Sequence, residues 1–200
     1  MIPHTHSKQA VMDRLRGHDV KGPELPIVDS SRLTTYDNPM DTFIESLQSV
    51  GGQAHVIDRI EQVHQILSEI PVFADAERIA SLAPDYVPGN VDASLVTDPH
   101  HLESLDWVIA TGEFGVAENG SIWVDGKTLP HRVMLFIAQY SAIIVPKAKI
   151  LHNMHEGYAA LGTPEPGFGI FISGPSKTAD IEQSLVLGAH GCRKLQVFLV

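Results

Sequence analysis

The segment ISGPSKTADIE, residues 172–182, has the composition of an anion-binding loop. An apolar strand precedes it, and its spacing predicts a helix over 178–187, whose unpaired N–H groups and dipole would face a ligand. The loop adds hydroxyl groups and one positive charge, which suit a small carboxylate or phosphate. We expect the ligand-binding residues here to be Ser173, Gly174, Ser176, Lys177 and Thr178.

An ordinary connection between a strand and a helix is the alternative for this segment. Asp180 and Glu182 lie in the first turn of the predicted helix, where their carboxylates would satisfy the dipole themselves. We favour the ligand-binding interpretation over this one.

A second group, VAENGS at residues 116–121, places a carboxylate at the end of a predicted strand. An exposed carboxylate at a sheet edge serves as a base or a nucleophile when its surroundings tune it. Glu118 is therefore a candidate catalytic residue and Asn119 a candidate ligand contact. Asn-Gly is also the strongest short hairpin signal, so the spacing alone favours a structural turn at Asn119 and Gly120.

Histidines form a third group of candidates. His190 lies in the flexible segment GAHGC, where it can transfer a proton, contact an anion or simply cap a helix end. His152 and His155 lie three apart on a predicted helix beside Glu156, a spacing that matches no zinc-protease motif. A partial metal site at His152 and His155 stays open, with a third ligand from His190, His131 or Glu118, but isolated histidine pairs are more often solvated or hydrogen-bonded. We favour the interpretation without a metal, and we pair His190 with Glu118 as the candidate catalytic residues.

Three motifs together resemble a known family. TGEFGVAENGSI at residues 111–122, ISGPSKTADIE and GAHG occur in the order and spacing of the lactate-utilisation protein C family, or LUD domain. The resemblance covers residues 40–200 and is strongest in the C-terminal half. It implies a Rossmann-like fold similar to sugar-phosphate isomerases and CoA-transferases. It also implies a part in the oxidation of L-lactate to pyruvate with iron–sulfur partner subunits.

The chain departs mildly from the family pattern at two places. Glu118-Asn119-Gly120-Ser121 stands where the family usually has Glu-Thr-Gly-Thr, and Cys192 stands where it has proline. The first change makes the loop similar to the Ser-Glu-Asn-Gly loop of CoA-transferases, whose glutamate is the nucleophile. Ala117 replaces the serine of that loop, which weakens the transferase interpretation.

Three functions therefore stay open, and with them the question of whether the chain is an enzyme. We favour the first, in which the chain is a component of L-lactate utilisation and binds a small anionic ligand at the Ser176 loop. Alternatively, it is a CoA-ester or acyl-transfer enzyme that uses Glu118, or a non-catalytic scaffold or sensor.

Composition and charge narrow the range of partners. The net charge of −10 and the pI near 5.4 argue against nucleic acid as a partner. Cys192 is the only cysteine, so we expect no intrinsic cofactor, with iron–sulfur clusters on partner proteins only. No signal peptide and no apolar run of about 18 residues are visible, so we expect a cytoplasmic protein without a membrane partner.

Hydrophobic patterning predicts an α/β fold: a Rossmann-like, mostly parallel sheet with helices on both faces. A short helix over 7–16 and an extended arm make up residues 1–38, and the α/β domain follows over 39–200. The arm gives the chain a means of forming a homo-oligomer. Helices are predicted at 39–50, 58–69, 148–161 and 178–187, and strands at 54–57, 72–74, 107–124, 133–137, 142–145, 170–172 and 195–200.

The predicted sheet also suggests where the site lies. In open α/β sheets, ligands bind outside the carboxyl ends of the strands. We therefore expect Glu118, Ser176 and His190 to meet at that edge.

Overall fold

The computed structural model describes residues 5–17, 22, 28–162, 167–179, 185–187 and 191–200. The chain divides into two units, Met1–Arg32 and Leu33–Val200. In the first unit, helix α1 (Thr5–Gly17) confirms the predicted N-terminal helix, and a 3-10 turn, η1, spans Ser30–Arg32. Residues 33–38, which the sequence analysis grouped with the arm, are part of the larger unit.

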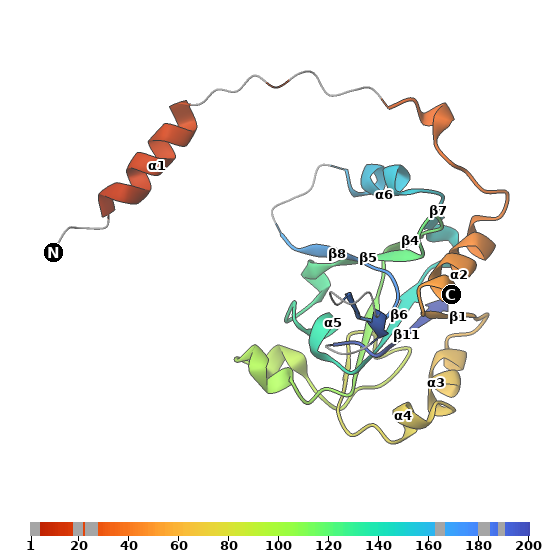
Figure 1. Cartoon of the computed structure of the whole chain (residues 1–200). Helices are drawn as coiled ribbons and strands as arrows, with labels where there is room; N and C mark the ends of the chain where they lie inside the picture. Colours follow the sequence, from red (N-terminus) through yellow and green to blue (C-terminus); the bar gives the residue numbers. More distant parts are fainter. Residues whose placement is uncertain (1–4, 18–21, 23–27, 163–166, 180–184, 188–190) are drawn as a thin grey trace. The chain divides into compact units, whose positions relative to one another are not determined.

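A parallel sheet of five strands forms the centre of the larger unit (Figure 1). Its spatial order is β1-β11-β6-β3-β2, and every neighbouring pair is parallel. The inner strands are continuous apolar runs, as is typical of strands covered on both faces. This sheet confirms the predicted α/β fold. The strands are β1 (Gln53–Val56), β2 (Ile79–Ser81), β3 (Trp107–Thr111), β6 (Tyr140–Val145) and β11 (Lys194–Leu199).

A second, mixed sheet of four strands has the order β7-β4-β5-β8. The hydrophobic pattern alone does not distinguish the strands of this sheet from those of the first. Strands β4 and β5 form the hairpin that Asn-Gly predicts, with Val116 opposite Ser121. Ile122 and Val124 of this sheet share one core with Ile143 of the parallel sheet. The strands are β4 (Phe114–Val116), β5 (Ser121–Asp125), β7 (Ile150–Leu151) and β8 (Gly169–Ile172).

Short helices complete the layers on both faces of the parallel sheet (Figure 1). Phe43 and Leu47 of α2 belong to the core that includes the second sheet. On the opposite face, Val63 of α3 and Phe73 of α4 pack with Trp107. The helices are α2 (Pro39–Ser49), α3 (Glu61–Ser68), α4 (Pro71–Ala74), α5 (Met134–Ile137) and α6 (Met154–Leu161).

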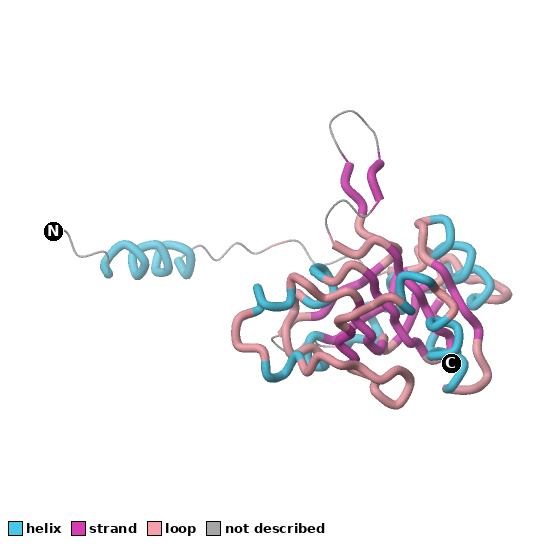
Figure 2. The backbone as a smooth tube through the Cα atoms, turned by 90° about the horizontal axis from the view of Figure 1, so that it is seen from below, coloured by secondary structure: helices cyan, strands magenta, loops and turns pink. Residues whose placement is uncertain are grey.

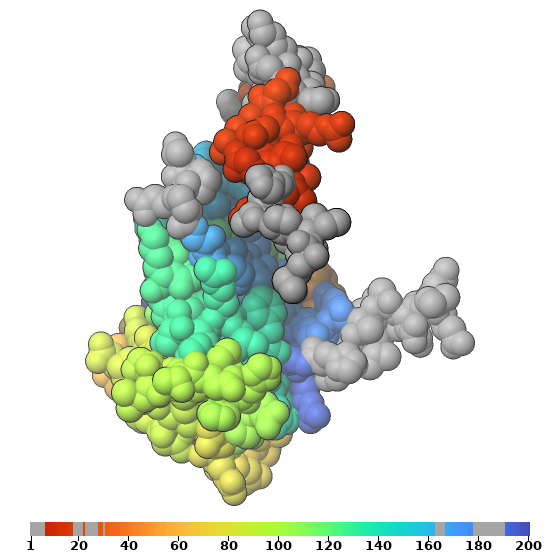
Figure 3. Space-filling model, turned by 90° about the vertical axis from the view of Figure 1, so that its left-hand side faces the viewer, coloured from red at the N-terminus to blue at the C-terminus, as the bar shows by residue number. Residues whose placement is uncertain are grey.

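Four 3-10 turns lie in the connections of the larger unit. Residues 90–105 contain two of them and cover part of one face of the molecule, where they are coloured lime in Figure 3. Among the described residues, no helix is both long and apolar enough to cross a membrane. The turns are η2 (Ala93–Leu95), η3 (Pro99–Leu102), η4 (Gly126–Thr128) and η5 (Lys147–Lys149).

Two predicted strands are wrong, because the structure has helices there. Residues 72–74 lie in α4, where Pro71 occupies a position at the helix start that suits its fixed φ and missing N–H. Residues 133–137 contain α5. The helix predicted over 148–161 begins only at Met154. A short apolar run does not distinguish a helix from a buried strand, because neither period is visible in it.

The predicted helix over 178–187 is also wrong. Strand β9 (Lys177–Ala179) pairs with strand β10 (Leu185–Leu187) in an antiparallel ladder, and the two project from the body in Figure 2. The run Leu-Val-Leu has a cross-strand partner in the folded chain, and this pairing outweighs its helical spacing. Directly after Ser176 the structure therefore has a strand and not a helix N-terminus, while residues 180–184 of the predicted helix lie outside the described part of the chain.

Candidate functional site

The two loops that carry the predicted site residues lie in contact. One is the 118–121 loop, at the tip of the β4–β5 hairpin, and the other is the 173–176 loop, which follows β8. The Ser173 hydroxyl donates to the Asn119 carbonyl at 2.8 Å. Because Ile122 pairs with Ile172 across β5 and β8, the loops at these strand ends are neighbours. The structure thus brings together two residues that the sequence analysis assigned to ligand binding.

Two glycines hold these loops against the C-terminal end of α2. Gly120 has a φ of 63° and Gly174 a φ of 71°, in the left-handed region that favours glycine. A Cβ atom at Gly120 would lie 2.5 Å from the Leu47 nitrogen, and one at Gly174 would lie 2.5 Å from the Val50 carbonyl oxygen. Neither position has room for a side chain, so both loops are anchored on the same helix end.

The Glu118 carboxylate lies at the N-terminus of α6. Its Oε2 accepts the backbone N–H of Met154 at 2.9 Å, and the Glu118 N–H donates to the His152 carbonyl at 3.1 Å. Helix N-termini have unpaired N–H groups and favour negative charge. Glu118 is exposed and therefore accessible to a ligand, but it also has a structural contact that the sequence analysis did not anticipate.

His152 joins the segment before α2 to the start of α6. Its Nδ1 accepts the backbone N–H of Tyr36 at 3.0 Å, and its own backbone N–H donates to Glu156 Oε2 at 2.8 Å. These contacts give His152 a structural role. In the part of the chain that the structure describes, no group of three or more His, Cys, Asp or Glu side chains could hold a metal ion.

A cavity of about 220 Å³ lies beneath the 173–176 loop. Its lining includes Phe136, Ser141, Ile172, Ser176, Cys192 and Leu195. The Ser176 N–H donates to the Cys192 carbonyl at 2.7 Å, so the loop is tied to the segment that leads into β11.

The predicted position of the site at the carboxyl ends of the parallel strands is wrong for this loop. Ser141 lies at the start of β6 and Leu195 at the start of β11, so the cavity and its loop lie at the amino ends. Among the other predicted residues, Lys177 is exposed and the backbone of Thr178 belongs to β9. His190 lies outside the described residues.

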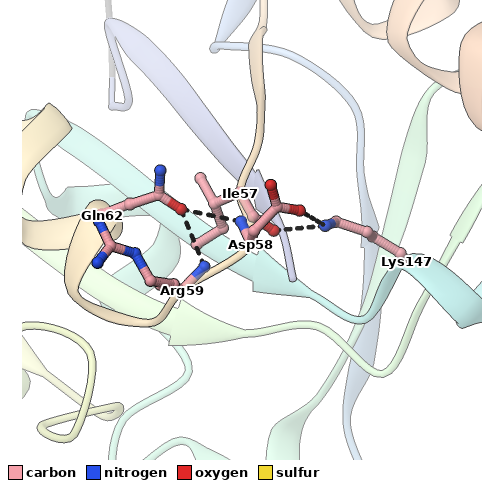
Figure 4. Close-up of polar contacts among 5 residues, drawn as sticks. All are labelled: Ile57, Asp58, Arg59, Gln62 and Lys147. Atoms are coloured by element: carbon pink, nitrogen blue, oxygen red, sulfur yellow. Dashed lines mark hydrogen bonds and ion pairs between the residues drawn. The ribbon is translucent and has the colours of Figure 1, made fainter.

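The carboxyl ends of β1 and β6 carry a polar cluster that the sequence analysis did not single out (Figure 4). Lys147 Nζ donates to the Ile57 carbonyl and lies 3.2 Å from Asp58 Oδ1. The backbone N–H groups of Asp58 and Arg59 both donate to Gln62 Oε1 at 2.9 Å. These contacts surround a hollow of about 180 Å³. The signal for this cluster was a charged residue two positions after a strand, Asp58 after β1 and Lys147 after β6.

Comparison with known proteins gives one family and one fold. The family model described as LUD domain matches residues 92–200. Lactate utilization protein C of Geobacillus thermodenitrificans (strain NG80-2) is 33% identical over 117 residues, which cover 56% of this chain and 45% of that protein. Lactate utilization protein C of Bacillus subtilis (strain 168) is 35% identical over 99 residues, which cover 46% of this chain and 41% of that protein. The chain thus matches less than half the length of these relatives.

Among solved structures, the crystal structure of a DUF162 family protein from Deinococcus radiodurans is similar to this chain. The TM-score is 0.64 at 19% sequence identity, and the match covers 81% of this chain and 96% of that one. At this identity the similarity establishes the α/β fold alone.

Proposed function

The chain belongs to the LUD domain family, and we propose that it is a component of L-lactate utilisation that binds a small carboxylate at the 173–176 loop. It works with iron–sulfur partner subunits in the oxidation of L-lactate to pyruvate. The names of its relatives support this pathway. The matched region, residues 92–200, contains both loops of the candidate site.

One observation carries the position of the ligand: the hydrogen bond between Ser173 and Asn119, which joins the two loops. A carboxylate at these loops must be held by local groups, because a net charge of −10 repels it at longer range. Lys177 is exposed beside the 173–176 loop and supplies the positive charge. Without a helix dipole behind the loop, this ammonium group becomes the main electrostatic contact.

Proton transfer in this proposal belongs to Glu118 and His190. Glu118 is supported by its exposed position next to Asn119, within the same pair of loops. His190 is supported by its place in the sequence, two residues before Cys192, whose carbonyl binds the loop at Ser176.

Thermal unfolding of the full chain with L-lactate, pyruvate or acetate tests the carboxylate site. A ligand that binds only the folded state stabilises it by about 2.7 kcal/mol at a concentration of about 100 Kd. We expect L-lactate or pyruvate to raise the Tm, the Lys177→Met variant to lose this increase, and Lys149→Met, at another exposed lysine, to keep it. An unchanged Tm with all three carboxylates would refute the carboxylate site, and co-purification with iron–sulfur proteins would then favour a scaffold.

CoA-ester chemistry with Glu118 as the nucleophile is a second candidate, supported by the exposure of this carboxylate at a hairpin tip. Incubation with acyl-CoA followed by mass spectrometry of the intact chain tests it. The Glu118 carboxylate would attack the thioester carbon and expel CoA as a thiolate, which leaves the acyl group on Glu118. This adduct would form on the wild type and not on Glu118→Gln, whose amide oxygen can still accept the Met154 N–H. Absence of an adduct on the wild type would remove this candidate.

A further inference from the structure

The cavity beneath the 173–176 loop is partly open to solvent and large enough for a small molecule. At about 220 Å³ it exceeds the roughly 150 Å³ of an apolar cavity known to stay dry and to bind benzene. Most of its lining is aliphatic or aromatic, with Leu135, Ile170 and Leu195 among the contributors, and none of the described lining residues is charged. Phe136 lines the cavity and is 47% exposed, which places one side of it near solvent.

One polar group in this lining lacks a partner. Ser141 is only 3% exposed, and its Oγ has no hydrogen-bond partner among the described residues. Along β6 its side chain is on the same face as Ile143 and Val145, whose core is shared with the second sheet. Leaving a buried hydroxyl unpaired is unfavourable, because the group has lost its hydrogen bonds to water. A ligand with one oxygen atom would supply the missing partner.

The neighbouring Cys192 thiol interacts with Ser141, but a thiol is only a weak hydrogen-bonding group and does not replace an oxygen partner. The Cys192 Sγ donates to the Lys194 carbonyl at 3.0 Å. Burial raises the pKa of the Cys192 thiol, and the polar groups of Ser141 and Lys194 oppose this shift more weakly. Cys192 therefore stays a neutral thiol in the cavity wall at neutral pH. As the only cysteine of the chain, it also reports on whether the cavity is occupied.

We propose that this cavity is a binding site for a neutral, mostly apolar small molecule, the size of a substituted benzene ring, that carries one hydroxyl or carbonyl oxygen facing Ser141. An anion does not suit it, since a buried charge needs a paired partner and no described lining residue is charged. A lone water does not suit it either, because water needs two to four polar partners and most of the wall is apolar. This site shares Gly174 and Ser176 with the proposed carboxylate site, but its test rests on Ser141 and Cys192 and not on the binding of a carboxylate.

Phenol, toluene and benzoate are suitable probes because they share a ring and differ in polarity and charge. Their Kd values with the full-length protein are measured by NMR titration. In parallel, the rate of Cys192 modification by methyl methanethiosulfonate is measured with and without each probe. We expect phenol and toluene to bind and to slow the modification. Benzoate should leave the modification rate unchanged, even where it binds as a carboxylate at Lys177.

The Ser141→Ala variant tests the assigned hydrogen bond. Loss of one net hydrogen bond corresponds to about a fivefold weaker binding of phenol, while toluene should bind as before and so report an intact cavity. Ser121→Ala, at another buried serine outside the cavity, should change neither Kd. The proposal is overturned if neither neutral probe protects Cys192, if benzoate protects Cys192 as well as phenol does, or if Ser141→Ala weakens phenol and toluene equally.

Discussion

The Ser173 hydroxyl donates a 2.8 Å hydrogen bond to the Asn119 carbonyl, and this contact joins two loops that are 54 positions apart in the sequence. Both loops also press a glycine against the end of α2, Gly120 against Leu47 and Gly174 against Val50. The relative position of the loops is thus set by backbone packing as well as by one side chain. Substitutions at these contacts should disturb the candidate site more than the rest of the fold.

Gly174→Ala should destabilise the protein more than Gly162→Ala does. Both glycines have a positive φ, and Gly162 also has a ψ of −144°; such backbone conformations cost a non-glycine residue about 1–3 kcal/mol. Only at Gly174 would the new Cβ also meet a backbone atom, the Val50 oxygen at 2.5 Å, whereas nothing lies within 4 Å at Gly162. Urea denaturation of the two variants measures the difference. Equal losses would mean that the loop is not held against α2.

Glu118 should contribute to stability through its contact with Met154. Removing a negative charge from near a helix N-terminus costs about 0.3–1 kcal/mol, so Glu118→Ala should lower the free energy of unfolding by that amount. Glu118→Gln should lose much less, because its amide oxygen still accepts the N–H. Glu113→Ala is the control, since Glu113 is exposed in the same hairpin. If Glu118→Ala is as stable as the control, the carboxylate has no structural role.

Lys147 should stabilise the carboxyl edge of the parallel sheet. Its ammonium group donates to the Ile57 carbonyl and its side chain is 30% exposed, while its ion-pair partner Asp58 is 92% exposed. Exposed ion pairs contribute about 0–1 kcal/mol, and a hydrogen bond to a charged group contributes about 1.5–3 kcal/mol. Thermal unfolding should therefore show a larger loss for Lys147→Met than for Asp58→Asn. The opposite order would contradict the geometry in Figure 4.

Stability should fall at alkaline pH because of Cys192. Burial raises the pKa of this thiol in the folded state, so the unfolded state releases the proton first as the pH rises. The stabilising contribution of the neutral thiol is complete below its unfolded-state pKa of about 8.5 and is lost between that pKa and the folded-state pKa. Unfolding free energies between about pH 8 and 10 should decline more steeply for the wild type than for Cys192→Ala. Parallel curves would show that the thiol is not desolvated.

The parts of the fold that could be predicted from sequence are those with a local signal. Asn119-Gly120 identifies the β4–β5 turn, and Asn38-Pro39 identifies the start of α2, where Asn38 caps the Asp41 N–H. Residues 133–137 and 142–145 are both apolar runs, yet one contains α5 and the other lies in β6. Only the pairing of β6 with β3 and β11 separates them, and that pairing is not visible in the local pattern.

In the candidate site, too, only the features with a local sequence signal could be predicted. The two motif loops could be identified from their polar and turn-forming residues, but their contact depends on the pairing of β5 with β8. The residues after Ser176 form strand β9 and not the predicted helix, because they pair with β10. Ser141 could not be singled out, because a serine in an apolar strand is noticeable only when its hydroxyl is found without a partner.

Growth on L-lactate is the most direct test of the proposal that the chain is a component of L-lactate utilisation. The gene is deleted in the source organism, and the strain is complemented with the wild type, Gly174→Ala or Gly162→Ala, with glucose as the control carbon source and expression levels matched. We expect the deletion to abolish growth on L-lactate but not on glucose. The wild type and Gly162→Ala should restore growth on L-lactate, and Gly174→Ala should restore it poorly. Unimpaired growth of the deletion strain on L-lactate would contradict the proposed function.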